Sequence, residues 1–355
     1  MVSAQAQYFS EDYANARSRF LEAGRTAGAQ LHELPMEMKG PSGETLAIDI
    51  AWLGPSDPAR VVIHSSGLHG IEGFAGSAIQ LALLDKSLSI PDDAACLFVH
   101  ALNPFGMAWL CRFNENNVDL NRNILLYGES WSGATRAYRL LEPFLNPRKP
   151  PRLDLFYLRA AYLVLRYGLR PLKQALAEGQ YEYAQGLFFG GKQLEKGPTL
   201  YLAWLTEYLG NIKRGFAIDV HTGLGKWGQE SLFLDRSAED EAELSTQLSL
   251  EVTSDPSKGG VAYHIRGGYA NIFDVLKQRP KIYMISQEFG TYPSLRVLRA
   301  LREENRLRHY GDATVEHPSK VWLKEVFAPK STKWGVRVVS RGISLAKAVM
   351  RYMFG

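Results

Sequence analysis

Cysteines and long apolar runs are scarce in this sequence of 355 residues. Cys96 and Cys111 are too few for a disulfide framework in so long a chain, so we expect reduced thiols in a cytoplasmic protein. The N-terminus has no basic start followed by an apolar stretch, which a secretory signal requires. The most apolar helical segment, 153–169, is interrupted by Arg159 and Arg166, so we expect no integral membrane span.

A large excess of charge of one sign is also missing. The 41 basic and 37 acidic residues leave a formal charge of +4. This charge is too small to indicate nucleic-acid binding, although it would slightly favour anionic substrates. Hydrophobic residues make up 46% of the chain and charged residues 22%, which excludes a disordered or fibrous chain and predicts a large buried core.

Apolar segments typical of strands alternate with helical segments along the chain. The pattern predicts strands at 46–53, 60–64, 94–100, 215–220, 281–286 and 334–339, and helices at 11–31, 76–84 and 343–354. A turn signal at 54–58 separates the first two strands, which we expect to be neighbours in a hairpin or meander. The alternation predicts an α/β fold, and we expect a single catalytic domain spanning 1–355.

The segment 147–197 differs from the rest in being helical, aromatic and basic. It contains Tyr157, Tyr162 and Tyr167, and its helical part is bounded by a Pro-Pro pair at 150–151 and a Gly-Gly pair at 190–191. We expect a helical insert here. Helices of the main layer, packed by ordinary aromatic residues, would give the same pattern.

The sharpest motif is Ser-Ser-Gly-Leu-His-Gly-Ile-Glu-Gly at 65–73, directly after a predicted strand. His69 and Glu72 lie three residues apart where a strand meets a helix, so the first helical turn can bring both side chains to one metal ion. Glycines within the motif let the backbone bend. On its own, a His-x-x-Glu pair also occurs at ordinary helix ends.

A catalytic zinc ion commonly keeps three protein ligands and one water, so a third ligand is expected at the end of another strand. The segment 216–223 supplies His221 at such an end. Strand periodicity places Asp219 on the same face, where it could orient a metal-bound imidazole. A cap of a helix or loop is the alternative for Asp219.

A hydrolytic zinc site also needs a base for the metal-bound water. Glu288 ends an apolar strand, a costly place for an unpaired carboxylate and therefore a candidate functional position. Taken without the other motifs, a structural carboxylate bonded to backbone amides would explain Glu288 equally well.

Candidate substrate-binding residues follow the first motif. Asn-Pro-Phe-Gly at 103–106 precedes Arg112, and Asp-Leu-Asn-Arg-Asn follows at 119–123. The planar fork of arginine matches a carboxylate bidentately, so Arg122, with Asn121 and Arg112, could clamp the free carboxylate of a substrate.

In this order, the motifs resemble those of the zinc carboxypeptidase superfamily over residues 45–292. They are His-x-x-Glu, Asn-Pro-x-Gly, an Arg, Asp-x-Asn-Arg-Asn, Asp-x-His and Glu-x-Gly-Thr. Within the superfamily, segments 8–13 and 186–191 are similar to an uncharacterised bacterial branch related to the succinylglutamate desuccinylase and aspartoacylase group.

The resemblance implies a three-layer α/β domain whose mixed, mostly parallel twisted sheet is flanked by helices, with the site at the carboxyl ends of strands. It implies one zinc ion per chain, with His69, Glu72 and His221 as ligands, Glu288 as general base, Arg112 beside the developing oxyanion, and Asn121 and Arg122 at the substrate carboxylate. The capping tyrosine of the family lies upstream of the catalytic glutamate, and Tyr269 and Tyr263 are both candidates.

Three functions stay open. They are a metallo-carboxypeptidase, an amidohydrolase of N-acyl amino acids, and a catalytically silent binding module, against which the presence of all three ligands and Glu288 argues. An open cleft beyond Arg122 would favour peptides, and a blind pocket would favour N-acyl amino acids; either substrate would carry a free carboxylate. Two histidines and a carboxylate also suit iron, cobalt or manganese, and zinc is preferred through the resemblance.

Overall fold

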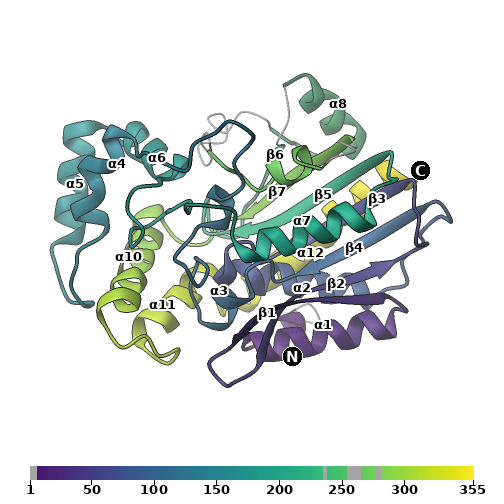
Figure 1. Cartoon of the computed structure of the whole chain (residues 1–355), viewed down its shortest axis with the longest axis horizontal. Helices are drawn as coiled ribbons and strands as arrows, with labels where there is room; N and C mark the ends of the chain where they lie inside the picture. Colours follow the sequence, from purple (N-terminus) through teal and green to yellow (C-terminus); the bar gives the residue numbers. More distant parts are fainter. Residues whose placement is uncertain (1–5, 235–237, 254–264, 277–280) are drawn as a thin grey trace.

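The computed structural model describes residues 6–234, 238–253, 265–276 and 281–355. Within these ranges seven strands form one sheet in the order β1-β2-β4-β3-β5-β7-β6 (Figure 1). The strands are β1 (Gln30–Lys39), β2 (Thr45–Leu53), β3 (Arg60–Ser66), β4 (Ala94–His100), β5 (Arg214–Thr222), β6 (Glu230–Leu234) and β7 (Lys281–Phe289).

The centre of the sheet is parallel and its margins are antiparallel. Strands β4, β3, β5 and β7 run in one direction, whereas β2 and β6 run against their neighbours. The sheet is therefore mixed and mostly parallel, and the predicted α/β class is confirmed. Because parallel strands end at the same edge, the residues that follow β3, β5 and β7 meet there.

Helices cover both faces of the sheet. They are α1 (Tyr13–Thr26), α2 (Gly73–Leu84), α3 (Pro104–Ala108), α4 (Arg136–Leu145), α5 (Phe156–Tyr167), α6 (Leu169–Glu178), α7 (Lys196–Tyr208), α8 (Ala238–Leu248), α9 (Asn271–Asp274), α10 (Ser294–Tyr310), α11 (Pro318–Phe327) and α12 (Thr332–Phe354). Short 3-10 helices are η1 (Ala6–Tyr8), η2 (Gly70–Glu72) and η3 (Leu120–Arg122). None of the described helices has both the length and the apolar character needed to cross a membrane.

Two apolar clusters form the interfaces between the three layers. Phe216 and Ile218 of β5 pack in a cluster with residues of α1, α2, α8 and α12. Ala217, which points to the opposite face, packs in a second cluster with residues of α7 and α9. Since both faces are covered, the central strands are apolar along nearly their whole length.

Helices α4, α5 and α6 lie away from the sheet, on the side of α10 (Figure 1). Both α5 and α6 fall within the segment 147–197, whereas α7, which begins in the same segment, packs on the sheet. An insert that covers the whole segment stays a prediction.

Two local predictions are wrong. The segment 334–339 is not a strand but part of α12, where Trp334, Val338 and Gly342 recur every four residues and are buried. The strands at 46–53 and 60–64 are not neighbours, because β4 lies between them and the antiparallel partner of β2 is β1.

Candidate metal centre

The turn after β3 is shaped by two glycines. The chain bends at Gly67, where φ is 71°, and then enters η2. A Cβ atom at Gly70 would lie 2.2 Å from the backbone carbonyl carbon of Gly106, so only glycine permits this contact. The amide of Gly106 donates to Oδ1 of Asn103 at 2.8 Å. The Asn-Pro-Phe-Gly motif is thus the surface against which the ligand turn packs.

Three buried side chains converge at the carboxyl edge of the sheet: His69, Glu72 and His221. Nδ1 of His69 lies 3.2 Å from Oε1 of Glu72. Nδ1 of His221 lies 3.4 Å from Oε2 of Glu72 and 3.2 Å from Nδ1 of His69. The structure therefore brings together the three residues predicted as metal ligands.

The spacing of these donor atoms fits a zinc ion. Tetrahedral zinc with nitrogen and oxygen ligands at about 2.0–2.1 Å separates neighbouring ligand atoms by about 3.3–3.4 Å. The two Nδ1 atoms are 3.2 Å apart, and each lies 3.2–3.4 Å from one oxygen of the Glu72 carboxylate, Oε1 for His69 and Oε2 for His221. The donor set of two imidazoles and one carboxylate is also one that zinc accepts in catalytic sites.

An aspartate backs each imidazole. Nε2 of His69 lies 3.1 Å from Oδ1 of Asp119, and Nε2 of His221 lies 2.7 Å from Oδ2 of Asp219. Ser65, the partner of Asp219 in the β3–β5 ladder, donates its hydroxyl to Asp219 at 2.6 Å. Such carboxylates favour the proton on Nε2 and leave Nδ1 free to bind a metal ion.

Asp119 is the functional residue that sequence reasoning missed. The sequence places it in a motif, Asp-x-Asn-Arg at 119–122, that is as compact as the Asp-x-His motif at 219–221. Burial would raise the pKa of Asp119, but the charges of His69 and Arg112 outweigh burial and hold the pKa well below its usual value. Asp119 is therefore a buried anion.

Neighbouring charges of both signs act on the predicted ligands. Burial alone would raise the pKa of Glu72, but the charges of His69 and Arg112 lower it well below its usual value. Burial alone would lower the pKa of His221, but Asp219 and Glu72 raise it well above 6.5. The shift of Glu72 thus reflects its cationic neighbours, and the shift of His221 reflects its anionic neighbours.

Arg112 lies beside the ligand group. Its Nη1 donates to Oε1 of Glu72 at 2.5 Å, and its Nε lies 3.4 Å from Oδ2 of Asp119. Its Nη2 lies 2.8 Å from Nε2 of His69. A guanidinium can only donate a hydrogen bond. Nε2 of His69 can therefore accept from Arg112, or carry a proton and donate it to Asp119, but not both. The role of Arg112 at an oxyanion stays a prediction.

Glu288 is placed next to His221 by the sheet itself. The two residues are partners in the β5–β7 ladder, so their side chains project from the same face. Oε1 of Glu288 accepts a hydrogen bond from the amide of Leu224 at 2.9 Å. Burial, together with the negative charge of Glu72, raises the pKa of Glu288 to about 8. A carboxyl with such a pKa can gain or lose a proton near neutral pH.

Arg122 is buried and only partly satisfied. Its Nη1 donates to the carbonyl of Asn121 at 2.7 Å, while its Nε has no hydrogen-bond partner among the described residues. Burial lowers the pKa of Arg122, and the charge of Asp119 opposes this change. Oδ1 of Asn121 accepts from the amide of Tyr269 at 2.9 Å. The Nε–H group of Arg122 is thus available to donate a hydrogen bond to a bound ligand.

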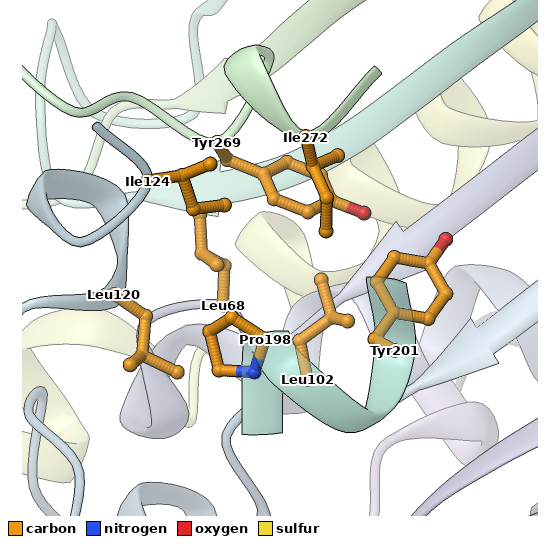
Figure 2. A pocket seen from close by; sticks show the side chains of 8 residues that line it. All are labelled: Leu68, Leu102, Leu120, Ile124, Pro198, Tyr201, Tyr269 and Ile272. Carbon is orange, nitrogen blue, oxygen red and sulfur yellow. The ribbon is translucent and has the colours of Figure 1, made fainter. Parts of the chain in front are cut away.

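Tyr269 lies in an apolar pocket (Figure 2). The lining residues are Leu68, Leu102, Leu120, Ile124, Pro198, Tyr201, Tyr269 and Ile272. The rings of Tyr201 and Tyr269 are stacked, with centroids 6.5 Å apart. Burial, together with the charges of Tyr201 and Asp219, raises the pKa of Tyr269 well above 10. A capping role for Tyr269 stays a prediction, and Tyr263 lies outside the described residues.

Fold and site together define a class: an α/β protein with a mixed, mostly parallel sheet that gathers a buried His-Glu-His group at its carboxyl edge. The chain belongs to the family described as "Protein of unknown function (DUF2817)", whose model matches residues 9–341. It has no significant match among curated proteins.

Solved structures that match this chain include an amidase and a carboxypeptidase. Murein-tripeptide amidase MpaA from Escherichia coli O157 is 16% identical, covering 78% of this chain and 91% of that chain, with a TM-score of 0.40. Carboxypeptidase A from Helicoverpa armigera is 11% identical over 94% and 73%, with a TM-score of 0.43. Bovine thrombin-activatable fibrinolysis inhibitor is 13% identical over 96% and 100%, with a TM-score of 0.44.

Proposed function

We propose that this chain is a zinc-dependent hydrolase that cleaves the amide bond next to a free carboxylate, as a metallo-carboxypeptidase does. The observation that carries the proposal is the convergence of His69, Glu72 and His221, with donor atoms 3.2–3.4 Å apart and an aspartate behind each imidazole. A bound zinc ion would supply the Lewis acidity that polarises the scissile carbonyl.

Glu288 is proposed as the general base. It accepts a proton from the attacking water and delivers it to the leaving amine. Its position beside His221 places it at the ligand group, and its pKa of about 8 gives it enough basicity to take a proton and enough acidity to return it. The hydrogen bond from the amide of Leu224 holds one carboxylate oxygen in place.

Arg122 and Asn121 are proposed to bind the substrate carboxylate. The support is the buried guanidinium of Arg122, whose Nε has no hydrogen-bond partner among the described residues and so can donate to a ligand. Arg112 would steady the negative charge that develops on the carbonyl oxygen; the support is the position of its guanidinium beside the proposed metal ligand Glu72.

A second candidate is an amidohydrolase of N-acyl amino acids. The observation that favours it is the close cover over Arg122, whose side chain is only 4% exposed. A Cβ atom at Gly179 would lie 2.8 Å from Cδ of Arg122, and the hydroxyl of Tyr181 donates to the carbonyl of Arg122 at 2.7 Å. An enclosed carboxylate site suits a short substrate better than a long peptide.

Metal analysis tests the site. We expect about one zinc ion per chain, as in other catalytic sites with three protein ligands, in protein purified without added metal. The double variant His69→Ala, His221→Ala should contain none. The matched control is His32→Ala, His317→Ala, which removes two imidazoles elsewhere and should keep the metal. Absence of metal in the wild type, even after zinc is added, would contradict the proposal.

Hydrolysis assays then separate the candidates. Zinc-loaded protein is given peptides with a free C-terminus, the same peptides with an amidated C-terminus, and N-acyl amino acids. Turnover of free peptides supports the carboxypeptidase, and turnover of N-acyl amino acids alone supports the second candidate. If zinc-loaded protein cleaves none of a broad panel, the chain is a binding module and the proposed hydrolysis is wrong.

A further inference from the structure

Helix α5 turns apolar side chains towards solvent. Leu158, Tyr162 and Leu165 lie at positions i, i+4 and i+7 and so share one face of the helix. Their exposed fractions are 68%, 63% and 87%. Phe156 and Ala160 are buried and lie on the opposite face. The helix is therefore packed on one side and presents a second apolar stripe on the other.

The chain on both sides of α5 also carries exposed apolar side chains. Leu153 and Leu155 precede the helix and are 91% and 61% exposed, and Leu169 follows it at 51%. The apolar α5 surface is defined here as the exposed side chains of Leu153, Leu155, Leu158, Tyr162, Leu165 and Leu169. Scattered exposed leucines are ordinary, but a set of them along one short segment is typical of a binding surface.

The stretch of chain that contains α5 is rich in basic residues. Residues 147–173 contain seven of them, Arg148, Lys149, Arg152, Arg159, Arg166, Arg170 and Lys173, and one acidic residue, Asp154. All but Lys173 are exposed. The net charge of this segment is therefore +6, whereas that of the whole chain is +4, so the positive charge of the protein is concentrated here.

The acidic residue of this segment is turned inward. Oδ2 of Asp154 accepts from Nη2 of Arg302 at 2.6 Å. Nε of Arg302 also donates to the carbonyl of Phe144 at 2.7 Å, and Nε of Arg306 donates to the carbonyl of Lys149 at 2.9 Å. These bonds fix the segment before α5 to α10 and remove the one carboxylate from the exposed surface.

We propose that the apolar α5 surface, with the basic residues around it, binds an anionic lipid bilayer, with α5 lying in the plane of the headgroups. Leucine and tyrosine on one face with arginine beside them are the composition of interfacial helices. At 12 residues α5 is about 18 Å long, too short to span a bilayer but long enough to lie on it. Charge complementarity selects anionic lipid, since a second copy would bring two surfaces of like charge together.

Co-sedimentation with vesicles tests the charge component. We expect the protein to bind phosphatidylcholine vesicles that contain phosphatidylglycerol at least about tenfold more tightly than pure phosphatidylcholine vesicles. Arg159→Glu, Arg166→Glu should lower binding by at least about tenfold, because each basic residue near an anionic surface contributes roughly a fivefold factor. Lys347→Glu, Arg351→Glu makes the same change in net charge near the C-terminus, at the other end of the molecule (Figure 1), and should bind nearly as well as the wild type.

A second pair of variants tests the apolar component. Leu158→Ser, Leu165→Ser should lose binding, whereas Val321→Ser, at a position on α11 that is 51% exposed, should keep it. All variants alter exposed side chains, so their melting temperatures should match the wild type. The proposal is overturned if wild-type protein ignores anionic vesicles, or if the two charge variants bind equally. It is also overturned if the wild type forms dimers that Leu158→Ser, Leu165→Ser dissociates and vesicles do not bind.

Discussion

Two buried networks of charged side chains differ in how their charges are balanced. In the network on α10, each cation contacts a carboxylate: Arg302 lies 2.6 Å from Asp154, and Lys320 lies 2.5 Å from Glu304. This network fixes α10 to α11 and to the segment before α5. Since every carboxylate of this network contacts a cation within the protein, it needs no ligand.

The metal centre is balanced differently. Its buried carboxylates are Glu72, Asp119, Asp219 and Glu288, and its guanidinium groups are Arg112 and Arg122. Four potential anions thus face two permanent cations, and the raised pKa values of His221 and Glu288 both reduce the negative surplus by retaining protons. A divalent cation would cancel the same surplus. A buried network that leaves one sign in excess indicates a binding site, and a matched one indicates an anchor.

The largest effect that could break this comparison is expected from Glu288→Gln. Removing a general base should lower kcat by about 10³-fold while the zinc content stays unchanged. The matched control is Glu230→Gln on the neighbouring strand β6, where Glu230 accepts from Gln287 at 2.5 Å and should affect kcat little. Full turnover by Glu288→Gln, measured on any substrate that the wild type cleaves, would show that Glu288 is a structural carboxylate and not the general base.

Metal removal should destabilise the protein because it leaves the negative surplus uncompensated. An ion present at about 1,000 times its Kd contributes roughly 4 kcal/mol to the free energy of unfolding, and a chelator should remove that contribution. Denaturant unfolding with and without chelator measures the effect. The variant His69→Ala, His221→Ala should not respond to the chelator; an equal response in the variant would mean that the ion binds elsewhere.

The contribution of the α10 network to stability should depend on its own charged side chains and not on bound metal. Lys320→Met leaves the buried carboxylate of Glu304 without its closest cation and should lower the free energy of unfolding by about 3 kcal/mol, with or without chelator. Lys320→Met, Glu304→Gln removes both charges and should lose less. A larger loss in the double variant would show that the pair is not a balanced unit.

Arg122→Ala should separate two kinds of substrate. We expect kcat/KM to fall by about 100-fold for substrates with a free carboxylate, because a charge-assisted buried contact is lost, and by far less for amidated ones. Arg337→Ala, an exposed change on α12, is the control. Similar losses on free and amidated substrates would assign Arg122 a structural role.

The smallest effect is expected at His100, a third kind of case: a buried ionisable group without a charged partner among the described residues. His100 stacks on Phe20, with centroids 4.7 Å apart, and Nε2 lies 3.1 Å from Oγ of Ser77. Burial, assisted by the charge of Arg17, lowers the pKa of His100 to about 3.

Because the unfolded chain binds this proton more tightly, the stability that His100 contributes is complete above about pH 6.5 and is lost as the pH falls towards 3. Between about pH 7 and pH 5 the loss should approach 2 kcal/mol. Denaturation curves of His100→Gln at both pH values should show a smaller pH dependence than the wild type. An unchanged pH dependence would mean that His100 remains charged in the fold.

The sequence predicts the central strands well and the margins poorly. β4 matches its predicted range 94–100, because a strand buried on both faces is apolar throughout. β1 was not predicted: it contains Pro35 and alternates half-buried with exposed residues, as an edge strand can. The segment 334–339 was assigned to a strand because its valines favour strands locally, whereas packing on the sheet decides the helix.

Local motifs also account for what could be foreseen of the site. His69 and Glu72 share one turn, and His221 and Glu288 each end a strand, so period and position indicate all four. The contact of Asp119 with His69 joins residues fifty positions apart through an irregular segment, which no local period describes. The surroundings of Tyr269 depend on α7 and on the ligand turn at once, and could not be foreseen for the same reason.

The distance along the chain between the ligands has a consequence for synthesis. His69 and Glu72 emerge early from the ribosome, but His221 reaches them only when β5 has paired with β3. A nascent chain that does not yet include His221 offers only His69 and Glu72, and two ligands bind a divalent ion weakly and with little selectivity. The complete site therefore forms only after most of the protein has been translated. Which ion is bound then depends on the affinity of the folded protein and on the metals available around it.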